Sequence, residues 1–109
     1  MSLFRVAEVY VQGSFAGVLC ETDFGYEFKY DESYLISENP KAVSLTLPLS
    51  SIPYQSKTLF SFFDGLIPEG WLFDIAIKSW KIKPQDRFGA LLCTCRDCIG
   101  DVSVREVQP

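Results

Sequence analysis

Three cysteines lie close together near the C-terminal end of the chain, with a spacing that could hold a metal ion. Cys93, Cys95 and Cys98 read CxCxxC, and Cys20 could complete four thiolates for a tetrahedral zinc ion. Structural zinc sites usually combine two short CxxC knuckles, whereas here the fourth ligand, Cys20, would have to come from a strand about seventy residues away. Because Cys93 also falls on the apolar stripe of a predicted helix, small buried hydrophobic residues are the main interpretation of the cysteines, and a metal-binding or redox module is the alternative.

The residues needed for most enzymatic mechanisms are absent from the sequence. It contains no histidine, which removes the commonest general base and the Ser-His and Cys-His nucleophile pairs. It also has no GxGxxG or GxxxxGK phosphate loop, no VAIK-type lysine and no HRDxxxxN segment. Asp64 and Glu69 could do acid–base work, but solvated helix caps are the simpler interpretation. We expect neither an enzyme nor a bound cofactor.

Trp71 is the residue whose environment matters most for function. If residues 69–80 form a helix, Trp71 lies on the side of Asp74 and Lys78, away from the apolar face. It is then either a partly exposed residue that contacts another protein or a core residue that packs under the loop at Pro53–Tyr54. The sequence leaves both possibilities open.

The aromatic content suggests contact with another protein. Nine Phe, five Tyr and two Trp in 109 residues exceed what a small core readily hides, and surface aromatics often serve as hot spots of interfaces. The net charge of −4 and the scattered Lys and Arg residues argue against direct nucleic-acid binding. With no signal-peptide core and no membrane-spanning stretch in the sequence, the protein is expected to be cytoplasmic.

Period-two alternation predicts most of the strands. A hairpin is expected over residues 4–19 with its turn at Gln12-Gly13-Ser14, followed by a strand over Tyr26–Tyr30. A short edge strand is expected over Val43–Leu47, ended by Pro48, and residues 50–57 are expected to form a loop. A final strand is expected over Val102–Arg105.

Helical spacing predicts three short helices. The first has Leu59, Phe62, Phe63 and Leu66 on one face, with Thr58 as its cap and Gly65 at its end. The second runs from about Pro68-Glu69 to Trp80, and the third from Pro84 or Gln85 to Cys93. The expected fold is α+β, a small antiparallel sheet covered on one face by about three short helices, in a single domain of residues 1–109.

Two longer strings carry a resemblance to a known family. Residues 62–71 read FFDGLIPEGW, and residues 94–104 read TCRDCIGDVSV. Both resemble the HipA N-terminal region, and the segments 9–19 and 44–49 fit the same family, so the resemblance covers nearly the whole chain. One departure is Cys95, which stands where the family commonly has Gly, so that the residue before Arg96 need not take a positive φ.

The resemblance implies a function without catalysis. The chain stops at Pro109, where HipA continues into its kinase body, and so looks like the separately encoded small subunit of three-component toxin–antitoxin systems. In those systems the small subunit is the antitoxin, the kinase HipT is the toxin, and HipB is a helix-turn-helix protein that binds DNA. The partners implied are a HipT-like Ser/Thr kinase and a HipB-like protein in a ternary complex.

The segment expected to contact the kinase is the junction around Gly65 to Trp71 with the helix that follows it. Trp71 is expected to insert near the nucleotide or substrate cleft of the kinase. The expected contact residues are Phe63, Asp64, Gly65, Leu66, Ile67, Pro68, Glu69, Trp71, Asp74 and Lys78. The other readings are the metal-binding module, a fragment of a longer HipA-type kinase, and an enzyme that acts on the kinase.

Overall fold

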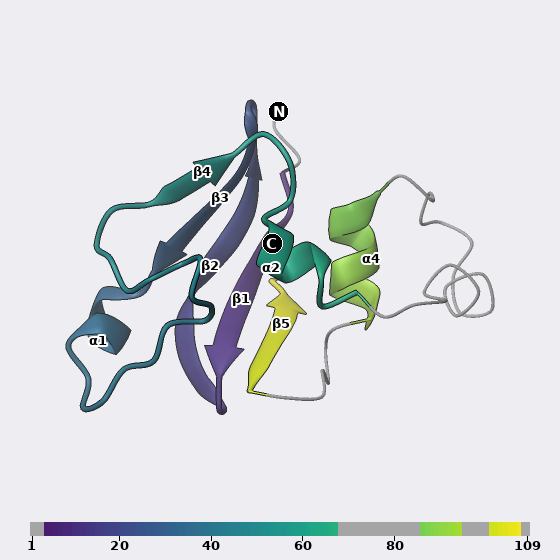
Figure 1. Cartoon of the computed structure of the whole chain (residues 1–109). Helices are drawn as coiled ribbons and strands as arrows, with labels where there is room; N and C mark the ends of the chain where they lie inside the picture. The colour runs from purple at the N-terminus through teal and green to yellow at the C-terminus, as the bar shows by residue number, and fades with distance from the viewer. Residues whose placement is uncertain (1–3, 68–85, 95–100, 108–109) are drawn as a thin grey trace.

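Five antiparallel strands form the sheet on which the rest of the fold is built (Figure 1). This computed structural model describes residues 4–67, 86–94 and 101–107. The strands are β1 (Val6–Val11), β2 (Ser14–Thr22), β3 (Gly25–Tyr30), β4 (Tyr54–Ser56) and β5 (Val102–Glu106). Their order is β4-β3-β2-β1-β5, so β1 to β3 form a meander, and β4 and β5 add to its two edges. The predicted hairpin, third strand and final strand are confirmed.

The alternation seen in the sequence decides which face of the sheet is buried. In β1, Ala7, Val9 and Val11 are buried, while the residues between them are partly exposed. The hairpin turn is formed by Gln12 with φ 51° and Gly13 with φ 83°, the left-handed pair that suits the twist of a two-residue hairpin. The turn sets the pairing of Val11 with Ser14 and of Tyr10 with Phe15, and an irregularity between Val9 and Tyr10 shifts the register for the rest of the hairpin.

The predicted strand over Val43–Leu47 is wrong. Only an isolated bridge between Ser44 and Leu47 is present, and Leu45 is fully exposed although Val43 and Leu47 are buried. The backbone of this segment bonds to a side chain instead of a neighbouring strand, since the Tyr30 hydroxyl donates to the Leu47 carbonyl and accepts from the Val43 N–H at 2.9 Å. The edge strand is β4, which lies in the stretch predicted to be a loop.

Within the described ranges, three short helices accompany the sheet: α1 (Glu32–Leu35), α2 (Ser61–Asp64) and α4 (Arg87–Thr94). The first predicted helix is present only as α2. Its N-cap is Phe60, without a side-chain cap, so Thr58 is not its capping residue. Gly65 does end α2, but with φ −69°, so no left-handed residue is needed there. The third predicted helix is confirmed as α4.

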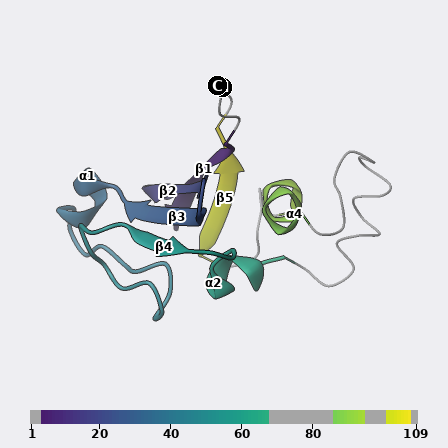
Figure 2. The same ribbon diagram turned by 90° about the horizontal axis from the view of Figure 1, so that it is seen from above.

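The arrangement of the helices confirms the predicted α+β class in part. Figure 2 shows α2 and α4 near each other, and α1, which was not predicted, at the opposite end of the molecule. The Asp31 carboxylate caps α1 by accepting from the Tyr34 N–H at 3.1 Å. The predicted helix over residues 68–80 lies outside the described residues, and a three-helix layer over one face is not confirmed.

Aromatic side chains link the sheet to α1, α2 and α4. Along β3, Phe28 contacts Tyr30 at 4.9 Å between ring centroids, and Tyr30 stacks on Tyr34 of α1 at 6.4 Å. Phe28 also contacts Phe63 of α2 at 5.5 Å. Tyr26, at the other end of the strand, meets the ring of Phe88 in α4 at 5.7 Å. Much of the aromatic content therefore forms the core itself, in contact geometries that add to simple burial.

Candidate functional site

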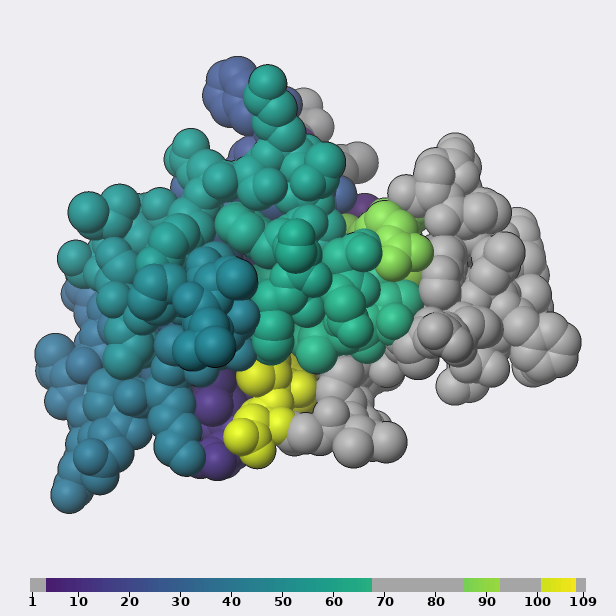
Figure 3. Space-filling model, in the orientation of Figure 1, coloured from purple at the N-terminus to yellow at the C-terminus, as the bar shows by residue number. Residues whose placement is uncertain are grey.

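The described part of the predicted contact segment is residues 63–67, in and after α2, which lies beside α4 (Figure 3). The structure places Phe63 and Ile67 in the core, where their side chains are 0% and 8% exposed. Asp64 and Leu66 are half-buried and Gly65 is exposed. Phe63 and Ile67 thus anchor the segment in the core, and the three residues between them form its outer surface. Sequence reasoning did not separate these two roles.

The remaining predicted contact residues cannot be placed. Pro68, Glu69, Trp71, Asp74 and Lys78 lie outside the described residues. Their assignment to a binding surface stays a prediction from the sequence.

An ion pair joins α2 to α4 at this segment. The Nε atom of Arg87 donates to Oδ1 of Asp64 at 2.7 Å, and both side chains are 41% exposed. At that exposure the pair contributes at most about 1 kcal/mol to stability. Asp64 therefore has a structural partner and is not positioned as a free general base. No local sequence pattern reveals this pairing, because the two residues are 23 positions apart.

A second charged cluster, which sequence reasoning missed, fixes the start of α4. The Arg5 guanidinium donates to both carboxylate oxygens of Glu21 and to both of Asp86, at 2.8–2.9 Å, and lies 5.3 Å from the centroid of the Phe88 ring. Asp86 Oδ1 also accepts from the Gly89 N–H at 3.0 Å. Such double, charge-assisted bonds define geometry well. Arg5 thus connects the start of β1, the end of β2 and the start of α4.

This cluster should make stability sensitive to acid. Hydrogen bonds from Arg5 hold the pKa values of Glu21 and Asp86 below their ordinary values of 4.5 and 3.8. A lowered pKa in the folded state contributes stability that is present above the ordinary pKa and is lost as the pH falls through the folded value. We expect the free energy of unfolding of Arg5→Gln, measured by urea titration, to fall less than that of wild type between neutral pH and about pH 3.

A matched control separates this effect from a general loss of positive charge. Lys29 is exposed on β3, so Lys29→Gln should follow the wild-type pH dependence. Parallel curves for Arg5→Gln and wild type would mean that the cluster does not stabilise the fold through its carboxylates.

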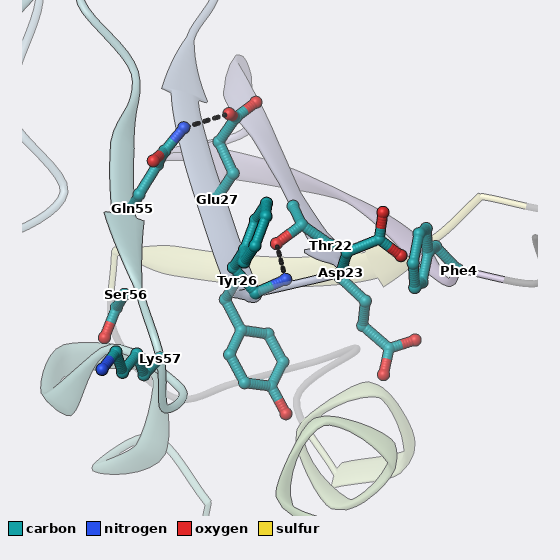
Figure 4. Close-up of a pocket in the computed structure, with 10 residues that line it drawn as sticks. Phe4, Thr22, Asp23, Tyr26, Glu27, Gln55, Ser56 and Lys57 are labelled. Atoms are coloured by element: carbon teal, nitrogen blue, oxygen red, sulfur yellow. Dashed lines mark hydrogen bonds between the residues drawn. The ribbon is translucent and has the colours of Figure 1, made fainter.

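A groove of about 540 Å³ lies at the end of the sheet where the β2–β3 turn meets β4 (Figure 4). Its walls include Phe4, Asp23, Phe24, Tyr26, Glu27 and Lys57. Figure 4 shows Glu27 bonded to Gln55 on one wall, and Asp23 on the same side of the groove as the Phe4 ring. Of the predicted contact residues that the structure describes, Phe63 to Ile67, none lines this groove, so the groove is separate from them.

The cysteine cluster remains untested as a metal site. Cys20 is a half-buried free thiol, and burial raises its pKa. The side chain of Cys93 and all of Cys95 and Cys98 lie outside what the structure describes. Within the described ranges, no group of three or more metal-binding side chains is found. In the same ranges, no helix has the length and apolar character to cross a bilayer.

The sheet order and the buried base of residues 61–67 define a small α+β domain with a five-stranded antiparallel sheet. The chain belongs to the HipA N-terminal domain family, whose model matches residues 7–105. A solved structure described as the N-terminal domain of HipA toxin is similar, with a TM-score of 0.75 and 30% sequence identity over 99% of this chain and 97% of that one. An uncharacterized protein of Haemophilus influenzae is 34% identical over 104 residues, covering 95% of this chain and 94% of that protein.

Proposed function

We propose that this chain is a HipS-like antitoxin that binds and inhibits a cognate HipT-like Ser/Thr kinase by protein–protein contact. The observation that carries the proposal is the match to the N-terminal domain of HipA toxin over 97% of that domain. The Haemophilus influenzae relative adds support, because 94% of its own length is this one domain. A protein similar to this chain can therefore consist almost entirely of this domain.

Binding to the kinase is expected from the way domains of one chain pack together, and the bound chain would then hold the kinase in an inactive arrangement. A domain that packs beside a kinase body has a surface fitted to that body, and a separate copy can bind the same place. The proposed contact surface consists of Asp64, Gly65 and Leu66, continued by Pro68, Glu69, Trp71, Asp74 and Lys78. Phe63 and Ile67 support it from the core, since neither side chain is available at the surface.

We propose further that the chain acts in the cytoplasm and catalyses no reaction of its own. The absence of histidine from the sequence supports an inhibitory rather than an enzymatic function. A HipB-like helix-turn-helix protein would join the complex and supply the DNA contact, which a chain of net charge −4 is poorly suited to make.

Co-purification with a HipT-like kinase tests the proposed contact. Asp64→Lys should weaken binding about tenfold or more, because a reversed charge at a contact surface repels what the original attracted. The fold should lose only about 1 kcal/mol, since the Asp64–Arg87 pair is half exposed. Affinity measured by calorimetry and stability measured by urea unfolding separate the two effects.

Glu32→Lys is the control, because it makes the same charge change at an exposed residue of α1. It should bind the kinase as wild type does. Equal affinities for Asp64→Lys and Glu32→Lys would remove α2 from the contact surface. If the wild-type chain does not co-purify with the kinase, the proposed function fails, and a fragment without an independent role becomes the better reading.

A further inference from the structure

Two of the exposed aromatic side chains of the described residues lie in the groove between the β2–β3 turn and β4. Phe24 is 88% exposed and Phe4 is 44% exposed, although the core contains several fully buried rings. Keeping a phenylalanine in water forgoes the free energy that its burial would provide. A pair of them in one groove marks a surface that another molecule can cover.

The turn that carries Phe24 is held in a fixed position. Gly25 has φ 143°, and a Cβ atom there would lie 2.2 Å from the Ser56 carbonyl oxygen, so the backbone of β4 packs directly against the turn. The Phe24 N–H donates to Oγ1 of Thr22 at 3.2 Å. The exposure of Phe24 is therefore set by the backbone around it, which makes the groove a preformed surface.

The charges of the groove favour a cation as its occupant. Glu21, Asp23 and Glu27 line it, against the single ammonium group of Lys57. Glu21 is already paired with Arg5, and Glu27 accepts from Gln55 at 3.3 Å. Asp23 makes no hydrogen bond or ion pair with any described residue, so its carboxylate is available to an incoming donor.

We propose that this groove binds an arginine side chain of a partner polypeptide. A guanidinium group can stack flat on an aromatic ring and donate two parallel hydrogen bonds to a carboxylate at the same time, which an ammonium group cannot do. The groove offers rings for stacking, those of Phe4 and Phe24, and a carboxylate that can accept the hydrogen bonds, that of Asp23. The site does not depend on kinase inhibition, because it shares no residue with the proposed contact surface.

NMR titration of the intact, isotope-labelled chain with N-acetyl-arginine amide at low salt tests the site. We expect saturable shifts confined to the amides of residues 22–26 and 55–57, with a dissociation constant in the millimolar range, about that of one contact without a large interface. The lysine analogue should bind about three- to fivefold more weakly, since it loses ring stacking and the second hydrogen bond. The neutral citrulline analogue should not saturate.

Two variants assign the binding to the groove. Asp23→Asn should weaken arginine binding about tenfold, because a charge-assisted hydrogen bond is lost. Phe24→Ala should weaken it about threefold, because a ring for stacking is lost. Leu45→Ala removes a fully exposed apolar side chain elsewhere and should leave binding unchanged. Equal binding of citrulline, unchanged affinity of Asp23→Asn, or no saturation by arginine would each overturn the proposal. None of these outcomes bears on whether the kinase is inhibited.

Discussion

Phe63→Ala should remove about 3–5 kcal/mol from the free energy of unfolding, the usual range for deleting a buried phenylalanine ring. Its side chain is fully buried and contacts the rings of Phe28, Phe60 and Phe62 at 5.3–6.2 Å between centroids. Domains of this size are typically stable by only about 5–15 kcal/mol, so a large part of the folded state's margin would be lost. Urea unfolding followed by fluorescence measures the change.

Phe24→Ala provides the control, because it removes the same side chain from an exposed position. It should change the free energy of unfolding by no more than about 0.5 kcal/mol. If the two variants were equally stable, Phe63 would not be a core residue. Phe63 would then be a candidate for direct contact with the kinase, as predicted from the sequence.

Trp71→Ala should weaken binding to the kinase roughly thirty- to a thousandfold. Truncating a central tryptophan of an interface typically costs on the order of 2–4 kcal/mol of binding free energy, and each 1.4 kcal/mol is tenfold in affinity. The expectation assumes that residues 69–80 are helical, in which case Trp71 would lie on the side of Asp74 and Lys78, away from the apolar face. Calorimetric titration of the purified kinase with the variant gives the change in affinity.

The stability of the same variant separates the two environments that the sequence leaves open for Trp71. If Trp71 contacts the partner, its truncation should change the free energy of unfolding only slightly. If it packs in a satellite core, truncation should lower that free energy by several kcal/mol. Wild-type affinity in Trp71→Ala would remove the residue from the contact surface. Weaker binding together with a destabilised fold would point to a core position that supports the surface indirectly.

The meander could be predicted because its signals are local. Alternation in Val6–Val11 and Tyr26–Tyr30, with turn residues at Gln12-Gly13, determines both the pairing and the buried face. The helix α4 follows from the spacing of Phe88, Leu91 and Leu92, all of which are buried. In each case the residues that carry the signal are neighbours in the sequence.

The errors arose where distant residues decide the structure. Val43–Leu47 has the alternation of a strand, but the hydroxyl of Tyr30 takes up its backbone groups from across the core. Conversely, β4 lies among Pro, Ser and Gln residues and forms because β3 presents an open edge to it. The Arg5–Asp86 contact joins residues 81 positions apart, which no local pattern reveals.

The high aromatic content was only partly a sign of a binding surface. In the described residues most of the rings line the core along β3, α2 and α4, and Phe4 and Phe24 are the ones left exposed. Likewise, the described part of the string that begins at Phe62 combines different roles, because Phe63 and Ile67 are buried whereas Asp64, Gly65 and Leu66 reach the surface. Composition alone cannot separate aromatic residues of the core from those of a binding surface.

The central claim is that this chain inhibits a HipT-like kinase by binding to it. The most direct measurement is the autophosphorylation rate of the purified kinase as the chain is added. We predict that the rate falls in proportion to the added chain and approaches zero near one equivalent, and that Glu32→Lys gives the same curve as wild type. A rate that stays constant at a large excess of folded chain would contradict the account.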